Sequence, residues 1–99
     1  MLIIREVFVA KPGQASRMAA LFKKVMASIA DVRILTDAVG EFNTVVMETQ
    51  VKDLADYERR MKEYETGDMF SKLDKETADA MKRYAEMYVT GRREVWRVI

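Results

Sequence analysis

The sequence contains no cysteine and no histidine. Without cysteine the chain forms no disulfide and has no thiolate nucleophile, and without both residues it cannot build the common zinc sites of sulfur and imidazole ligands. The lack of histidine also removes the usual imidazole general base and the common axial ligand of haem. We therefore expect no bound metal and no cofactor. No residue pattern in the chain identifies a catalytic group, so the catalytic residues are unknown at this stage.

Long apolar runs and a strong net charge are also absent. No apolar stretch approaches the roughly 20 residues of a transmembrane helix, and 17 basic residues against 16 acidic ones give a net charge of +1. We expect neither a membrane nor a nucleic acid as partner. The apolar run at the N-terminus is too short for a signal peptide, so we expect a cytoplasmic protein. With 99 residues, 49% of them hydrophobic, the sequence predicts one domain over residues 1–99.

Four segments have the β-branched and aromatic composition of strands. Pro12-Gly13 ends the first segment, Gly40–Asn43 makes a hairpin turn between the second and third, and Gly91 ends a helix before the last. The predicted strands are Leu2–Ala10, Val32–Val39, Thr44–Val51 and Arg92–Ile99.

Apolar residues spaced three and four apart predict helices between these strands. Asp53 is placed to cap the second helix, and Asp56 three residues later makes a capping-box-like pair with it. Asp56–Arg60 and Glu58–Lys62 are expected ion pairs on that helix, and Gly67-Asp68 interrupts it. The inner-face residues are Met18, Leu21, Phe22, Val25, Met26 and Ile29 in the first helix; Leu54, Tyr57, Met61 and Tyr64 in the second; Met69, Phe70, Leu73, Thr77, Met81, Tyr84 and Tyr88 in the third.

The resulting order, βαββααβ, predicts an α+β ferredoxin-like sandwich with an antiparallel four-stranded sheet. Right-handed crossovers place all the helices on one face of such a sheet and leave the other face bare. The strands are nevertheless apolar on both faces: in the first strand, Val7 and Val9 lie opposite Ile4 and Phe8. An exposed apolar face of this size is typical of an interaction site. We therefore expect a second copy to cover it in a homodimer.

The stretches EVFVAKPGQASRMAALF, VRILTDAVGEFNTVVMETQVKDLADYERRM and YVTGRREVWRVI together resemble the dimeric α/β-barrel superfamily, most closely its NIPSNAP-like members. The resemblance covers nearly the whole chain and implies a homodimer whose two sheets form a barrel. The superfamily includes cofactor-free monooxygenases, haem-dependent enzymes and stress-response proteins, so the resemblance implies a fold rather than one function. Its haem-dependent branches usually use a proximal histidine, which this chain lacks.

Charged, amide and aromatic side chains on the strands and the second helix are the candidate ligand-binding groups. A carboxylate, an amide and a guanidinium in a dry cavity could orient a small polar or aromatic molecule. The alternative is that the charged residues form interface ion pairs and that the aromatic ones pack in the core. Further strand residues, Glu6, Arg33, Asp37 and Arg93, share faces with some of them. The candidates are Arg5, Glu48, Gln50, Tyr57, Trp96 and Arg97.

Two classes of function follow from these residues. The first is a binding protein that holds a small molecule in a cavity between sheet and helices or between two sheets. The second is a cofactor-free monooxygenase or isomerase acting on an aromatic or quinol-like substrate, as the resemblance implies. RNA-binding domains share this topology but need an aromatic-rich third strand, and TVVMETQV has no aromatic residue.

Overall fold

The computed structural model describes residues 1–67 and 71–99. Its elements follow the predicted order, with a short 3₁₀ helix, η2, added before the last strand. They are β1 (Leu2–Ala10), α1 (Ala15–Val25), β2 (Val32–Thr36), β3 (Thr44–Val51), α2 (Leu54–Glu65), α3 (Lys75–Lys82), η2 (Tyr84–Met87) and β4 (Tyr88–Arg97). The strands form one antiparallel sheet in the order β2-β3-β1-β4. The α+β ferredoxin-like fold predicted from the sequence is therefore confirmed.

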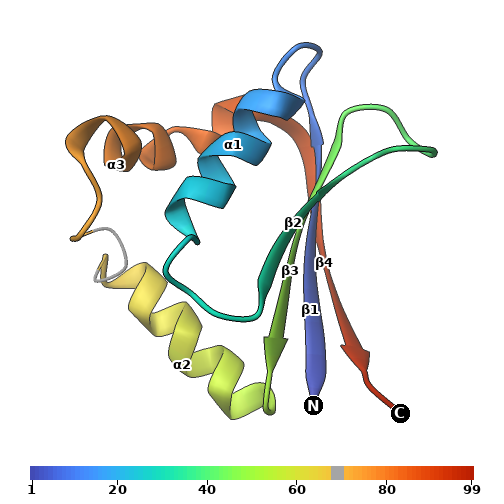
Figure 1. Ribbon diagram of the computed structural model, residues 1–99, viewed down its shortest axis with the longest axis vertical. Coiled ribbons are helices and arrows are strands. Elements are labelled where there is room, and N and C mark those ends of the chain that lie inside the picture. Colours follow the sequence, from blue (N-terminus) through green and yellow to red (C-terminus); the bar gives the residue numbers. More distant parts are fainter. Residues whose placement is uncertain (68–70) are drawn as a thin grey trace.

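Within the described residues, all the helices lie on one side of the sheet and the other side carries none (Figure 1). The core lies between the helices and the sheet, where Met18 and Phe22 of α1 pack on Phe8 of β1 and Val45 of β3. Aromatic packing strengthens this contact, because the ring centroids of Phe8 and Phe22 lie 5.3 Å apart. The even-numbered residues of β1 therefore face the helices, and the odd-numbered residues between them face the open side of the sheet.

The predicted capping pair of Asp53 and Asp56 at the start of α2 is confirmed in part. The Asp53 carboxylate accepts a hydrogen bond from the backbone N–H of Asp56 at 2.8 Å, which satisfies one of the free donors of the first turn. The Asp56 carboxylate accepts from the N–H of Lys52 at 2.9 Å rather than from that of Asp53. Gly67 follows α2 with a φ of +79°, a left-handed conformation that glycine adopts without strain. Asp68 lies outside the described residues.

The prediction for the third helix is wrong in its extent. Asp74 accepts hydrogen bonds from the backbone and hydroxyl of Thr77, so the helix begins after this cap, at Lys75. It ends at Lys82, and Tyr84 belongs to η2 instead. The predicted members Met69 and Phe70 lie outside the described residues.

Gly91 does not end a helix; it lies inside β4, which begins at Tyr88 rather than Arg92. The reason is tertiary packing. A Cβ at Gly91 would lie 3.3 Å from Cδ1 of Phe8, and the ring of Tyr88 packs on Phe8 at 5.0 Å between centroids. The absence of a side chain at Gly91 therefore makes room for an aromatic contact that the sequence pattern does not reveal.

The second strand is also shorter than predicted, because β2 ends at Thr36 and not at Val39. The carboxylate of Asp37 accepts a hydrogen bond from the backbone N–H of Thr44 at 3.0 Å, which closes the loop between β2 and β3. Val39 and Phe42 in that loop are 98% and 83% exposed. In α1, the helix ends at Val25, with Met26 as its cap residue.

Candidate functional site: a cavity between the helices and the sheet

A cavity of about 390 Å³ lies between α1, α2, α3 and the helix-facing side of the sheet. Most of its wall is aromatic or made of methionine, a flexible side chain that adapts to different ligand shapes. The volume is within the range of small-molecule sites. Its apolar lining includes Phe8, Phe22, Met26, Met47, Met61 and Met81.

Three polar side chains meet at one part of this wall. Glu6 of β1 and Arg93 of β4 are cross-strand neighbours, and their side chains form an ion pair with Nη2 3.5 Å from Oε2. The guanidinium carbon of Arg93 lies 5.5 Å from the ring centroid of Tyr57, within the range of a cation–π contact. The strand register and α2 therefore bring a carboxylate, a guanidinium and a phenol to one place beside an apolar surface.

Two tyrosines of the cavity, Tyr57 and Tyr84, have raised pKa values and are therefore neutral near pH 7. Burial raises the pKa of Tyr57, and the Glu6 carboxylate adds to this effect. Burial also raises the pKa of Tyr84 to about 12, with a further contribution from its hydrogen bond to Tyr64. A neutral phenol can donate its proton in a hydrogen bond near neutral pH, so each ring offers a donor and not a base.

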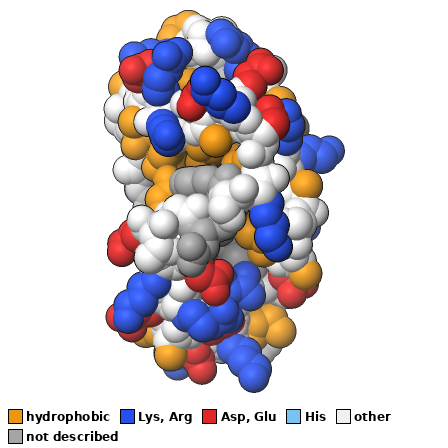
Figure 2. Space-filling model, turned by 90° about the vertical axis from the view of Figure 1, so that its left-hand side faces the viewer, with side chains coloured by type: hydrophobic (Ala, Val, Ile, Leu, Met, Phe, Trp, Pro, Cys, Tyr) orange, Lys and Arg blue, Asp and Glu red, His pale blue; other side chains and the backbone are white. Residues whose placement is uncertain are grey.

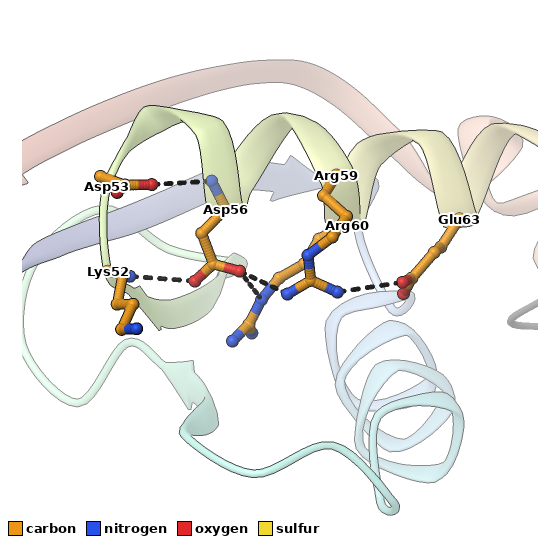
Figure 3. Close-up of polar contacts among 6 residues, drawn as sticks. All are labelled: Lys52, Asp53, Asp56, Arg59, Arg60 and Glu63. Carbon is orange, nitrogen blue, oxygen red and sulfur yellow. Dashed lines mark hydrogen bonds and ion pairs between the residues drawn. The ribbon is translucent and has the colours of Figure 1, made fainter.

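Asp56 organises the arginines of α2 (Figure 3). Its Oδ1 lies 2.6 Å from Nη2 of Arg59, whose Nη1 also contacts Glu63 at 3.1 Å. The Nε of Arg60 lies 3.5 Å from the same Asp56 oxygen. The predicted Asp56–Arg60 pair is thus confirmed, but Arg59 holds the shorter contact. Glu58 and Lys62, the other predicted pair, form no ion pair within the described part of the chain.

Two buried donors of α2 are left without partners. Among the described residues, the hydroxyl of Tyr57 and Nη1 of Arg60 are both shielded from solvent and hydrogen-bonded to nothing. A buried donor that lacks an acceptor costs about 1–3 kcal/mol, and most such groups in folded proteins are satisfied. Both residues line the cavity. Two donors in the wall of the cavity therefore lack an acceptor.

The open face of the sheet holds a row of charges that alternate in sign across all four strands. The register places Arg33, Glu48, Arg5 and Glu94 side by side. Glu48 is 5% exposed. Its carboxylate accepts a hydrogen bond from Nε of Arg5 at 2.9 Å and bonds from the guanidinium of Arg33. The hydrogen bond from Arg33, followed by that from Arg5, holds the pKa of Glu48 below its ordinary value against the effect of burial.

The candidate residues from the sequence fall into two groups. Arg5, Glu48, Gln50 and Trp96 share the open face, where Gln50 and Trp96 flank Ile3 in the row next to the charges. Tyr57 lies across the sheet from them and lines the helix-side cavity. The remaining candidate, Arg97, pairs with Leu2 at the far end of β4 and does not line this cavity. No single site unites the set.

The sequence patterns do not single out four polar residues of the cavity wall, Arg60, Tyr84, Glu6 and Arg93, as binding residues. Arg60 has the spacing of a surface ion-pair residue, and Tyr84, whose phenol could donate a hydrogen bond, has the helical spacing typical of a core aromatic residue. Glu6 and Arg93 were considered only as members of a strand face. For Glu6 the sequence does contain a signal. Glu6 lies between Ile4 and Phe8 at the period of two residues, so a charged side chain occupies a position that the strand pattern assigns to the core.

The helix side of the molecule carries acidic and basic side chains interspersed, with hydrophobic side chains visible at its middle (Figure 2). No patch of one sign dominates this view, and the electrostatic footprint expected of a nucleic-acid-binding face is a basic one. Within residues 1–67 and 71–99, no helix has the length and apolar composition to span a membrane.

The helix-covered sheet and its cavity can be compared with known proteins. No family model matches the sequence, and no curated protein matches it either. Solved structures do match. An uncharacterised NIPSNAP domain protein from Burkholderia xenovorans superposes with a TM-score of 0.73 over 100% of this chain and 95% of its own, at 12% identity. The chain has the NIPSNAP-domain fold.

Two further structures extend the comparison. A NIPSNAP family protein from Agrobacterium tumefaciens has a TM-score of 0.73 over 99% of this chain and 85% of its own, at 14% identity. A Deinococcus radiodurans protein provisionally assigned as an antibiotic biosynthesis monooxygenase has a TM-score of 0.62 over 100% and 93%, at 7% identity. At such identities the likeness establishes the fold and leaves function to the site.

Proposed function

We propose that this NIPSNAP-fold protein binds a small molecule in the cavity between its helices and its sheet, and that it acts as a homodimer. The observation that supports binding is the composition of the cavity: an aromatic and methionine wall with one cluster of polar groups, Glu6, Arg93 and Tyr57. Ligand sites in proteins commonly combine an apolar wall with a few convergent polar groups.

Titration with Nile red, a neutral apolar dye, tests the cavity. Met61 lines it, whereas Leu54 on the same helix is 62% exposed and does not. Met61→Trp fills the cavity, and Leu54→Trp adds the same bulk outside it. We expect saturable dye fluorescence in the wild type and in Leu54→Trp, and its loss in Met61→Trp. Equal dye binding by both variants would place the dye elsewhere and contradict the proposal.

The homodimer is supported by the open face of the sheet. Ile3, Val46 and Leu35 lie on it, and Trp96 on the same face is 53% exposed. The charge row is self-complementary: a twofold axis parallel to the strands sets Glu48 of one copy against Arg5 of the other, and Arg33 against Glu94. A second sheet on this face would cover the apolar residues and meet opposite charges.

Light scattering tests the homodimer. We expect twice the chain mass at micromolar concentration. Val46→Lys, at the centre of the open face, is expected to give the mass of one chain, while Leu54→Lys on α2 leaves the dimer intact. A wild-type mass of one chain that does not rise with concentration would refute the homodimer.

A cofactor-free monooxygenase or isomerase is the second candidate function. The observation that favours it is the carboxylate of Glu6 beside Tyr57 in a largely apolar cavity, because a carboxylate can remove a proton from a bound substrate. The fold is shared with the Deinococcus protein provisionally assigned as an antibiotic biosynthesis monooxygenase. Oxygen consumption with an added hydroxyanthracene tests this. No consumption above that of a Glu6→Gln variant would exclude it for this substrate.

A further inference from the structure

We infer that the ligand of the cavity carries a carboxylate on an apolar ring system. The inference rests on the proposed function and names the chemical class of the ligand. Its basis is the two donors without acceptors on one helix, Tyr57 and Arg60. They are three residues apart, so they lie on the same face of α2.

The charge of Arg60 is incompletely matched within the protein. Its neighbour Arg59 takes the short contact with Asp56, at 2.6 Å, and a second contact with Glu63. Arg60 reaches Asp56 only through Nε at 3.5 Å, which leaves Nη1 buried and unpaired. A guanidinium presents its donors as a planar fork that matches a carboxylate.

The second arginine of the cavity also has a loose partner. The separation of 3.5 Å between Arg93 and Glu6 is an ion pair but longer than a charge-assisted hydrogen bond, which is about 2.7–2.9 Å. A ligand carboxylate near Tyr57 would thus have three donor groups on the same cavity wall, the Tyr57 hydroxyl, Arg60 and Arg93. An ammonium group at the same place would meet the unpaired donors and two guanidinium groups, and the carboxylate beside it, Glu6, is already paired with Arg93.

The rest of the cavity lining determines the apolar body of the ligand. Phe8 and Phe22 present rings, and Met26, Met47 and Met81 present thioethers that contact rings favourably. A flat two-ring system is well matched to a surface of this kind and is smaller than the cavity volume of about 390 Å³.

The unpaired donors also lower the stability of the ligand-free protein. Replacing Tyr57 by Phe removes a buried hydroxyl that has no partner, so the ligand-free variant should be as stable as the wild type or more stable. The same change should weaken carboxylate binding. A residue that only supports the fold would show the opposite pattern, with a loss of stability and no specific loss of affinity.

Isothermal titration of the full chain at fixed salt tests the inference with three probes: naphthalene-2-carboxylate, 2-naphthylmethanol and 2-naphthylmethylammonium. We expect the carboxylate to bind at least tenfold more tightly than the other two. Tyr57→Phe should weaken it about three- to tenfold, and Arg60→Met about tenfold or more. Lys62→Met removes one positive charge from the exposed side of α2 and should leave the affinity unchanged.

The outcomes separate this inference from the proposed function. If the alcohol or the ammonium binds as tightly as the carboxylate, or if Lys62→Met weakens binding as much as Arg60→Met, the carboxylate assignment is overturned. Nile red binding that depends on Met61 would then still support a cavity for another ligand. If Met61→Trp does not affect the dye, the proposed function itself fails.

Discussion

The stability lost on removing the Glu48 carboxylate depends on whether a second copy covers the open face of the sheet. In a single chain, the side chains of its partners Arg5 and Arg33 are 41% and 67% exposed. Removing the carboxylate with Glu48→Leu would leave both guanidinium groups hydrated, so the loss would approach that of a single charged hydrogen bond, about 1.5–3 kcal/mol. Beneath a second sheet both groups would be stranded away from water. Breaking a buried pair in that way costs about 3–5 kcal/mol.

The homodimer therefore predicts a free energy of unfolding about 3–5 kcal/mol lower for Glu48→Leu, and a smaller loss for Glu48→Gln, which keeps the shape and part of the hydrogen bonding. Urea melts at one fixed protein concentration measure both, because the stability of a dimer depends on concentration. Val39→Leu, at a 98% exposed position in the loop between β2 and β3, is the control. A loss for Glu48→Leu within about 0.5 kcal/mol, typical of exposed sites, would refute the reasoning that this carboxylate is a buried ion-pair partner.

Three other changes follow from the structure. The lowered pKa of Glu48 means that its contribution to stability is complete above the ordinary pKa of 4.5 and is lost as the pH falls through the lower folded-state value. In urea melts, the difference in the free energy of unfolding between wild type and Glu48→Gln should therefore become smaller below pH ~4.5. A difference that does not change with pH would contradict this. Gly91→Ala places a Cβ 3.3 Å from a packed Phe8 ring and should cost about 1–3 kcal/mol, against about 0.5 kcal/mol or less for the exposed Thr90→Ala. Asp53→Ala removes the cap of α2 and should cost about 1 kcal/mol, seen as a lower midpoint in thermal melts, whereas no change would mean that the cap is dispensable.

The fold could be predicted because each element carries its own local signal. The β-branched run of β1, the apolar stripe of α1 and the Asp53 cap of α2 are patterns that short stretches of sequence determine. The errors occur where contacts between distant residues decide the outcome. Tyr88 continues the helical spacing of Tyr84, yet it enters β4 because its ring packs on Phe8. Gly91 has the appearance of a helix terminator, yet it makes room for the same ring.

The site was less predictable for a related reason. The face on which a strand residue lies follows from its number, so the grouping of Arg5 with Glu48 was within reach of the sequence. The pairing of Glu6 with Arg93 depends on the register between β1 and β4, which no local pattern determines. Arg60 reaches Asp56 only through Nε and keeps Nη1 unpaired, while Arg59 takes the short contact with Asp56. Competition between two adjacent arginines for one carboxylate appears only in three dimensions.

The central claim, a ligand site between helices and sheet, is tested most directly by the methionine methyl groups. Met26, Met47, Met61 and Met81 line the cavity, whereas Met1 is 62% exposed and does not line it. In ¹³C-methyl-methionine NMR spectra of the full chain titrated with Nile red, the four cavity signals are predicted to shift together and saturate while that of Met1 stays in place. Saturable shifts that exclude the four cavity methyl groups, or no saturable shift at all, would contradict the claim.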